Sequence, residues 1–136
     1  MDSRYGRQDI PNKIEAGEIK EKYWGSIQTI YADDEFTLKE IFMKAGTQSS
    51  MEYHLRKDEK YYIQSGKLRL GLRIGRAQNK SIILSKGDVY HVPPGLMHMR
   101  MAIEDTIIIE WSNKDDDHDS NIVEDGKSYK FVETTE

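Results

Sequence analysis

Nine short segments rich in β-branched and aromatic residues follow one another between residues 26 and 111, and turns rich in Gly, Pro or Asp separate most of them. Their apolar residues do not recur with a helical period, so the pattern predicts an all-β sandwich or barrel. Nine strands in that span leave no room for crossover helices, and we therefore expect antiparallel sheets. The predicted strands are residues 26–31, 36–44, 50–55, 60–64, 67–74, 80–84, 89–92, 97–102 and 106–111.

The chain of 136 residues is long enough for one such domain, but not for two. We expect an N-terminal arm over residues 1–22, which could contain one helical turn, and a β-barrel over residues 23–112. Residues 113–136 are expected to form an acidic C-terminal tail, with the aspartates of 115–119 solvated. Residues 112–136 hold eight acidic residues and three lysines, so this segment accounts for the overall net charge of −4.

Charge and composition also argue against several classes of function. A net negative charge disfavours nucleic-acid binding, which needs a basic surface. No apolar run is long enough to span a membrane, and the first 13 residues lack the apolar core of a secretory signal. We therefore expect a cytoplasmic protein without a nucleic-acid or membrane partner. The absence of cysteine fits that location and excludes a metal site built from thiolates.

A metal site in this chain must be built from His, Asp and Glu, and the sequence has four histidines. Glu52 and His54 are two residues apart on a predicted strand, so they share a face. Glu59 follows a turn that can fold it back beside His54, and His98 follows the turn at residues 93–95. Two imidazoles with one or two carboxylates can hold one divalent ion, and open positions would make the site catalytic. These ligands permit Zn, Mn, Fe or Ni.

The same residues fall at the spacing of the two motifs of the cupin family. The first motif is matched by Gly46, Glu52, His54, Glu59 and Gly66, with Glu52 where the first His usually stands. The second is matched by Gly87, Pro93, Gly95 and His98, with Ala102 in place of the usual Asn. The chain thus resembles a cupin over residues 23–112. The resemblance implies a double-stranded β-helix, a jelly-roll barrel with its metal inside near one mouth.

Within the cupins, the chain is similar to the cupin domain of type II mannose-6-phosphate isomerases. That domain also opens with a Trp-Gly pair, here residues 24–25, and has His and Glu at two of the ligand positions. Glu52 stands where that domain has Gln, and Leu55 and Arg56 replace its run of histidines. The resemblance implies a metal-dependent, homodimeric isomerase of carbohydrate metabolism whose small-molecule substrate is a sugar or a sugar phosphate.

An aldose–ketose isomerase needs a base near the metal and a group that holds the substrate. Glu52 is a candidate base if it does not ligate the metal, and Tyr61 shares a strand face with Glu59. Arg100, two residues beyond the last ligand, should also face inward and could hold a phosphate by two hydrogen bonds. Lys39 is a second cationic candidate for the same role.

Other interpretations of these residues stay open. Two histidines and a carboxylate also suit an Fe(II) oxygenase, and a cupin without catalysis would be a sugar- or ligand-binding module. His91 lies out of register with the ligands and His118 lies in the acidic segment, so we expect structural or solvated roles for both. Met97, Met99 and Met101 alternate on one strand and form either a packed core or a dimer interface.

Overall fold

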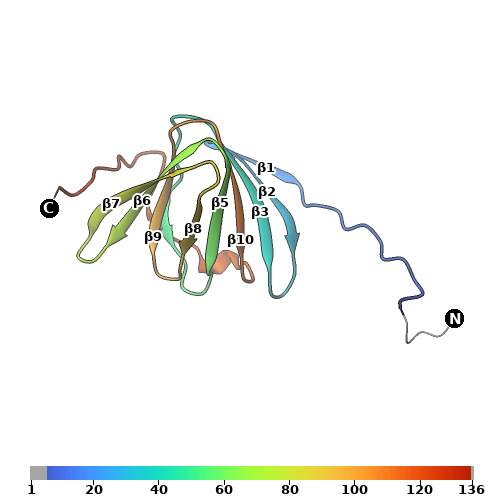
Figure 1. The fold of residues 1–136 in the computed structure, drawn as a ribbon. Helices are drawn as coiled ribbons and strands as arrows, with labels where there is room; N and C mark the ends of the chain where they lie inside the picture. The colour runs from blue at the N-terminus through green and yellow to red at the C-terminus, as the bar shows by residue number, and fades with distance from the viewer. Residues whose placement is uncertain (1–5, 136) are drawn as a thin grey trace.

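The computed structural model describes residues 6–135, whose strands form two antiparallel sheets (Figure 1). The strands are β1 (Ile19–Lys22), β2 (Gly25–Ala32), β3 (Thr37–Met43), β4 (Met51–Tyr53), β5 (Glu59–Ser65), β6 (Lys67–Ile74), β7 (Gln78–Ser85), β8 (Val89–Val92), β9 (Met97–Ala102), β10 (Thr106–Ser112) and β11 (Asn121–Glu124). The short 3-10 helix η2 (Asp117–Asp119) lies between β10 and β11. The larger sheet has the order β1-β2-β3-β10-β5-β8, and the smaller has the order β11-β4-β9-β6-β7. The expected all-β jelly roll is thereby confirmed, and the described residues contain no helix that could cross a membrane.

The nine predicted strands are all present, each with limits within two residues of the predicted ones. Sequence reasoning missed β1 and β11, because their sequences, IKEK and NIVE, are short and lack a clear apolar alternation. The helical turn considered for the arm does not form in residues 6–22. Its isoleucines gain no apolar neighbours that would fix a helix, since Ile10 is 92% exposed and Ile14 is 73% exposed. The arm instead extends away from the barrel before β1 joins the edge of the larger sheet (Figure 1).

The barrel interior changes from apolar at one end to charged at the other. Along β10 every second side chain is buried, from Ile108 in the main core to Glu110 near the strand's end. On the neighbouring strand β5 the buried series is Ile63, Tyr61 and Glu59, and the register pairs Ile108 with Ile63 and Glu110 with Tyr61. Strand alternation therefore carries two carboxylates to the same end of the barrel. This end is called the mouth below.

The C-terminal segment packs on the barrel and is not a solvated tail throughout. Strand β11 pairs with β4, and Phe131 is buried in a second apolar cluster with Met51 and Met99, against which Met97 and Met101 pack. The methionine stripe is therefore a packed core beneath the chain's own C-terminal segment. A glycine permits this contact, because a Cβ at Gly71 would lie 2.8 Å from the Phe131 ring.

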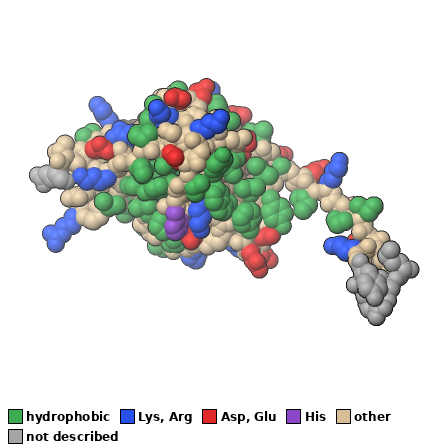
Figure 2. Space-filling view, in the orientation of Figure 1, with side chains coloured by type: hydrophobic (Ala, Val, Ile, Leu, Met, Phe, Trp, Pro, Cys, Tyr) green, Lys and Arg blue, Asp and Glu red, His purple; other side chains and the backbone are tan. Residues whose placement is uncertain are grey.

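The outer face of the larger sheet carries half-buried and exposed apolar side chains. Cross-strand neighbours there include Phe42 with Ile107 and Tyr62 with Ile109. Figure 2 shows hydrophobic side chains over much of this face of the molecule. Trp111 lies on this outer face and is half-buried, because it alternates with the buried Glu110.

Candidate metal centre

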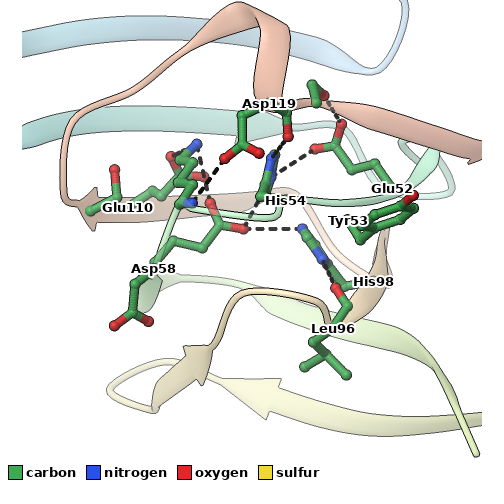
Figure 3. A network of polar contacts seen from close by, with 12 residues as sticks. Glu52, Tyr53, His54, Asp58, Leu96, His98, Glu110 and Asp119 are labelled. Carbon is green, nitrogen blue, oxygen red and sulfur yellow. Dashed lines mark hydrogen bonds and ion pairs between the residues drawn. The ribbon is translucent and has the colours of Figure 1, made fainter.

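Four side chains from three strands and one turn meet at the mouth. Glu52 lies on β4, directly opposite His98 on β9, and His54 follows the end of β4. Glu59 opens β5 and points inward as the first buried residue of that strand. Figure 3 shows Glu52, His54 and His98 turned toward a common point. The structure thus brings together all four residues that the sequence predicts as metal ligands.

Backbone carbonyls fix the orientation of both imidazoles. His98 Nδ1 lies 2.8 Å from the carbonyl oxygen of Leu96, and His54 Nδ1 lies 3.1 Å from that of Asp119 (Figure 3). A carbonyl oxygen only accepts hydrogen bonds, so Nδ1 carries the proton in each ring. In the neutral ring the lone pair is then on Nε2, which faces the centre. Such a bond from the second ring nitrogen is typical of metal-ligating histidines.

One buried atom shows that the site suits a cation. His98 Nε2 makes no well-aligned hydrogen bond within residues 6–135, although Glu59 Oε1 lies 3.0 Å away. Burial lowers the pKa of His98, but the adjacent carboxylate of Glu59 outweighs burial, and the net shift of the pKa is upward. A positive charge between these two atoms is thus favourable. Either a proton or a metal ion can supply it, and a metal ion also satisfies the neighbouring ligands.

The spacing of the remaining ligand atoms fits one ion. His54 Nε2 lies 3.6 Å from Glu52 Oε1 and 3.7 Å from Glu59 Oε1. The ligand atoms of Glu52, His54 and His98 all lie within 4.8 Å of one another. Ligands about 2.0–2.2 Å from an ion are themselves separated by roughly 3–4 Å, so the atoms of Glu52, His54 and His98 can surround one ion after a modest rearrangement. Glu59 Oε1 lies beside this group, 3.0 Å from His98 Nε2.

Both carboxylates are held in the ionised form that a metal ligand needs. Burial raises the pKa of Glu52, but a hydrogen bond from Ser120 and the charge of Arg100 lower it more. Ser120 Oγ donates to Glu52 Oε2 at 2.6 Å, which leaves Oε1 directed toward His54. Burial also raises the pKa of Glu59, and His98 together with Lys57 brings it well below the usual range.

A buried lysine joins the centre to a third carboxylate. Lys57 Nζ lies 3.2 Å from Glu59 Oε2 and 3.1 Å from Glu110 Oε2, and its side chain is 7% exposed. Burial lowers the pKa of Lys57, but these carboxylates raise it further, so the ammonium stays charged. Burial raises the pKa of Glu110, and the negative charge of Glu59 adds to that shift.

The three predicted catalytic residues other than Glu52 also reach the mouth. Arg100 Nη1 donates to the hydroxyl of Tyr61 at 3.4 Å, and that hydroxyl donates to Glu59 Oε1 at 3.2 Å. Burial raises the pKa of Tyr61 well above its ordinary value, so the phenol is a proton donor and not a base near neutral pH. Lys39 lies across the mouth and forms an ion pair with Asp115.

Sequence reasoning missed four residues around the ligands. Asp119 holds the turn after His54, and Ser120 orients Glu52; both come from the C-terminal segment, so no local pattern identifies them. Lys57 gives no signal either, because lysine is rarely buried. Glu110 could have been found, since it continues the buried alternation of β10. His91 and His118 lie on the exposed surface, away from the centre.

Fold and site together define a jelly-roll protein with a candidate His/carboxylate metal centre inside one end. The chain belongs to the cupin family, because the family model described as Cupin matches residues 36–130. A search of curated proteins gave no match.

Solved structures with the same fold include three proteins of low sequence identity. A variant of oxalate decarboxylase from Bacillus subtilis is 15% identical with a TM-score of 0.70, and the match covers 79% of this chain and 30% of that one. CapF, a capsular polysaccharide assembling protein of Staphylococcus aureus, is 22% identical with a TM-score of 0.72, covering 82% and 33%. KdgF from Halomonas sp. is 22% identical with a TM-score of 0.59, covering 68% and 82%. The chain thus spans about a third of the first two proteins, and all three matches support the fold alone.

Proposed function

We propose that this protein is a metal-dependent cupin enzyme that isomerises a small sugar derivative, by resemblance a sugar phosphate. The observation that carries the metal dependence is His98 Nε2, which is buried without a well-aligned hydrogen bond among residues 6–135 and faces Glu59. The same centre opens on a cavity of about 160 Å³ whose lining includes Glu52, His54, Arg100 and Glu110. A small molecule in this cavity would lie beside both the ligands and the charged groups.

The mechanism divides the charged residues into distinct roles. Glu52, His54, Glu59 and His98 would hold one divalent ion, which supplies a Lewis acid that polarises a substrate carbonyl. Glu110 would move the proton between adjacent substrate carbons. Its raised pKa suits proton transfer better than that of an exposed carboxylate. The carbon-bound proton leaves one carbon and returns to the next, and the hydroxyl proton passes to the former carbonyl oxygen, so the isomerisation needs no added oxidant or reductant.

Arg100 supports an anionic substrate. Its side chain is buried, and its Nε has no hydrogen-bond partner within residues 6–135. The guanidinium lies 5.4 Å from the ring of Trp24 and lines the cavity beside Glu52. A phosphate or carboxylate of the substrate would satisfy this unpaired donor. The cytoplasmic location and the homodimer remain predictions, and the methionine stripe no longer supports the dimer because the C-terminal segment covers it.

Elemental analysis of the purified protein tests the metal site. We expect about one equivalent of a divalent metal in the wild type and its loss in His98→Ala. His118→Ala is the matched control, because it also removes one histidine, but an exposed one that is not among the proposed ligands. Retention of the metal by His98→Ala would overturn the assignment.

Turnover under controlled atmosphere tests the reaction on the same preparations. An isomerase should interconvert aldose and ketose phosphates without oxygen when loaded with Zn²⁺ or Mn²⁺. Oxygen uptake with Fe²⁺ would identify an oxygenase instead. A ligand-dependent thermal shift without turnover of any sugar would indicate a binding module and contradict the proposed enzyme.

A further inference from the structure

One carboxylate lies between two lysines at the mouth. Lys39 Nζ is 2.5 Å from Asp115 Oδ2, and Lys57 Nζ is 3.5 Å from Asp115 Oδ1. Lys39 is largely buried, with 14% of its side chain exposed. Within residues 6–135, Asp115 is the carboxylate at ion-pair distance from Lys39. Lys57, in contrast, also contacts Glu59 and Glu110, so it stays neutralised without Asp115.

The Lys39–Asp115 pair stands between two cavities. The inner one, of about 160 Å³, contains the metal-ligand side chains of Glu52 and His54. The outer one, of about 410 Å³, is a groove lined by the arm and β1, including Lys20 and Lys22. Both cavities are lined by Ile27, Lys39, Asp115 and Asp117. Withdrawal of the Asp115 side chain would join them into a space in the range of roughly 300–1,000 Å³ that is typical of small-molecule sites.

The backbone on either side of Asp115 is anchored independently of the pair. Asp119 accepts hydrogen bonds from three backbone amides of residues 55–57, and Asp116 forms an ion pair with Arg56. On the other side, Asn113 bonds to the backbone of Arg56 and Asp58. Asp115 can therefore exchange its contact with Lys39 for one with water without loss of these anchors.

Charge favours an incoming anion once Asp115 is withdrawn. The inner cavity and centre then hold Lys39, Lys57 and Arg100 against the carboxylates of Glu52, Glu59, Glu110 and Asp117, while Asp116 is paired with Arg56. These seven charges sum to one negative charge, and a bound divalent ion would change the sum to one positive charge. In a buried site a net positive charge favours a negatively charged ligand.

We propose that Lys39, supported by Lys57, is a binding subsite for the oxyanion of the substrate, and that Asp115 occupies it until the substrate displaces the side chain. The proposal deepens the proposed function and rests on it, because the ligand is the substrate of the metal centre. The oxyanion is a carboxylate or a phosphate, and the Asp115 carboxylate shows that the subsite accepts the first.

Phosphate titration of the metal-loaded full chain tests the subsite. Asp115→Asn should bind inorganic phosphate about tenfold more tightly than the wild type in calorimetry at fixed pH and salt, because the competing carboxylate is gone. Asp117→Asn is the matched control, since it removes the same charge from the same groove, and its affinity should stay within about twofold of the wild type. Lys39→Ala in the Asp115→Asn background should abolish the gain. Acetate titrations of the same set show whether carboxylates share the subsite with phosphate.

The outcomes separate the subsite from the proposed function. Equal gains in Asp115→Asn and Asp117→Asn, or a gain that survives Lys39→Ala, would overturn the subsite. Asp115→Ala repeats the comparison if the Asn amide still bonds to Lys39 or impairs folding. A protein that holds its metal and shows no gain contradicts the subsite alone. A protein that shows the gain but holds no metal contradicts the proposed enzyme and leaves the anion subsite established.

Discussion

Asp119 connects the C-terminal segment to the candidate metal centre through both its backbone and its side chain. Its carbonyl oxygen accepts from His54, and its carboxylate accepts from the backbone amides of Leu55, Arg56 and Lys57 at 2.8–3.0 Å. The side chain is buried, with the residue only 3% exposed. Burial raises the pKa of Asp119, but the three amide hydrogen bonds outweigh it and lower the pKa. One residue therefore fixes both the ring of a ligand and the turn that follows it.

Replacement of Asp119 by Asn should weaken folding and metal binding together. Loss of the charged acceptor should lower the free energy of unfolding by roughly 2–4 kcal/mol, since hydrogen bonds to charged groups are strong. Metal affinity should fall about 10–100-fold, as expected when the partner of a ligating histidine is disturbed. Urea unfolding and metal titration measure the two effects, and Asp117→Asn controls for the charge.

The difference in the free energy of unfolding between the wild type and Asp119→Asn should depend on pH. The folded pKa of Asp119 is below the unfolded value of about 3.9, so the carboxylate contributes its full stabilisation above that pH. Its contribution is lost as the pH falls through the folded pKa. The gap between wild type and Asp119→Asn should be constant between about pH 5 and 7 and narrow below about pH 4. A gap that widens in acid would contradict this role.

The residues of the site divide according to how far their partners lie along the chain. His54, Glu59 and His98 are predictable because motif spacing and strand alternation place them, and Glu52 follows from its register with His54. The residues that orient these ligands are not predictable from the sequence, because a contact such as that of His54 with Asp119 spans 65 positions. No local periodicity reports a partner so distant.

At the scale of elements, the C-terminal segment forms the cover of the smaller sheet. Phe131 packs against Met51 and Met99, and its ring lies over Gly71. The guanidinium of Arg69 is 5.0 Å from the same ring. These contacts bury an apolar face that would otherwise be exposed, so the segment contributes to folding although much of it is irregular.

Truncation of Phe131 should therefore destabilise the whole domain. Phe131→Ala should lower the free energy of unfolding by about 3 kcal/mol, in the range found for buried aromatic residues. Val132→Ala is the matched control, because that neighbouring side chain is 63% exposed and should cost little. Chemical denaturation followed by tryptophan fluorescence measures both. Equal stabilities for the two variants would show that the segment does not pack on the sheet in solution.

Strands in the barrel were predictable because each alternates or concentrates apolar residues between turn residues. The packing of the acidic C-terminal segment on the barrel was not predictable. Its composition is typical of a solvated tail, whereas its packing depends on Asp119 and Phe131. Pairing of β11 with β4 also follows no sequence rule, since a four-residue strand without apolar alternation carries no signal for its partner. Composition thus predicted the charge of this segment but not its place.

At the scale of the whole molecule, the residues of the candidate metal centre come from both sheets. Glu52 and His98 belong to the smaller sheet and Glu59 to the larger one. An ion held by all three would join the sheets at the mouth, where the interior is charged and lacks the apolar contacts found deeper in the barrel. Metal binding should therefore stabilise the fold as a whole.

Chelation should lower the melting temperature of the wild type. Free metal at about 100 times its dissociation constant should add roughly 2.7 kcal/mol to the free energy of unfolding, provided that the unfolded chain binds none. His98→Ala should show little response to the same metal, and His118→Ala should respond like the wild type. Scanning calorimetry with and without chelator measures the difference. An equal response in all three would place the stabilising ion elsewhere.

The long-range contacts of the centre also bear on how the protein is made. All four proposed ligands have been synthesised once residue 98 has left the ribosome, yet the groups that orient His54 and Glu52 have not. The contact that orients His54 forms only after Asp119 has been synthesised. The contact that orients Glu52 needs Ser120, which lies 68 positions further along the nascent chain. Contacts of such sequence separation form slowly. If the centre binds an ion, we therefore expect its tight capture to follow the synthesis and folding of the segment that contains Asp119 and Ser120.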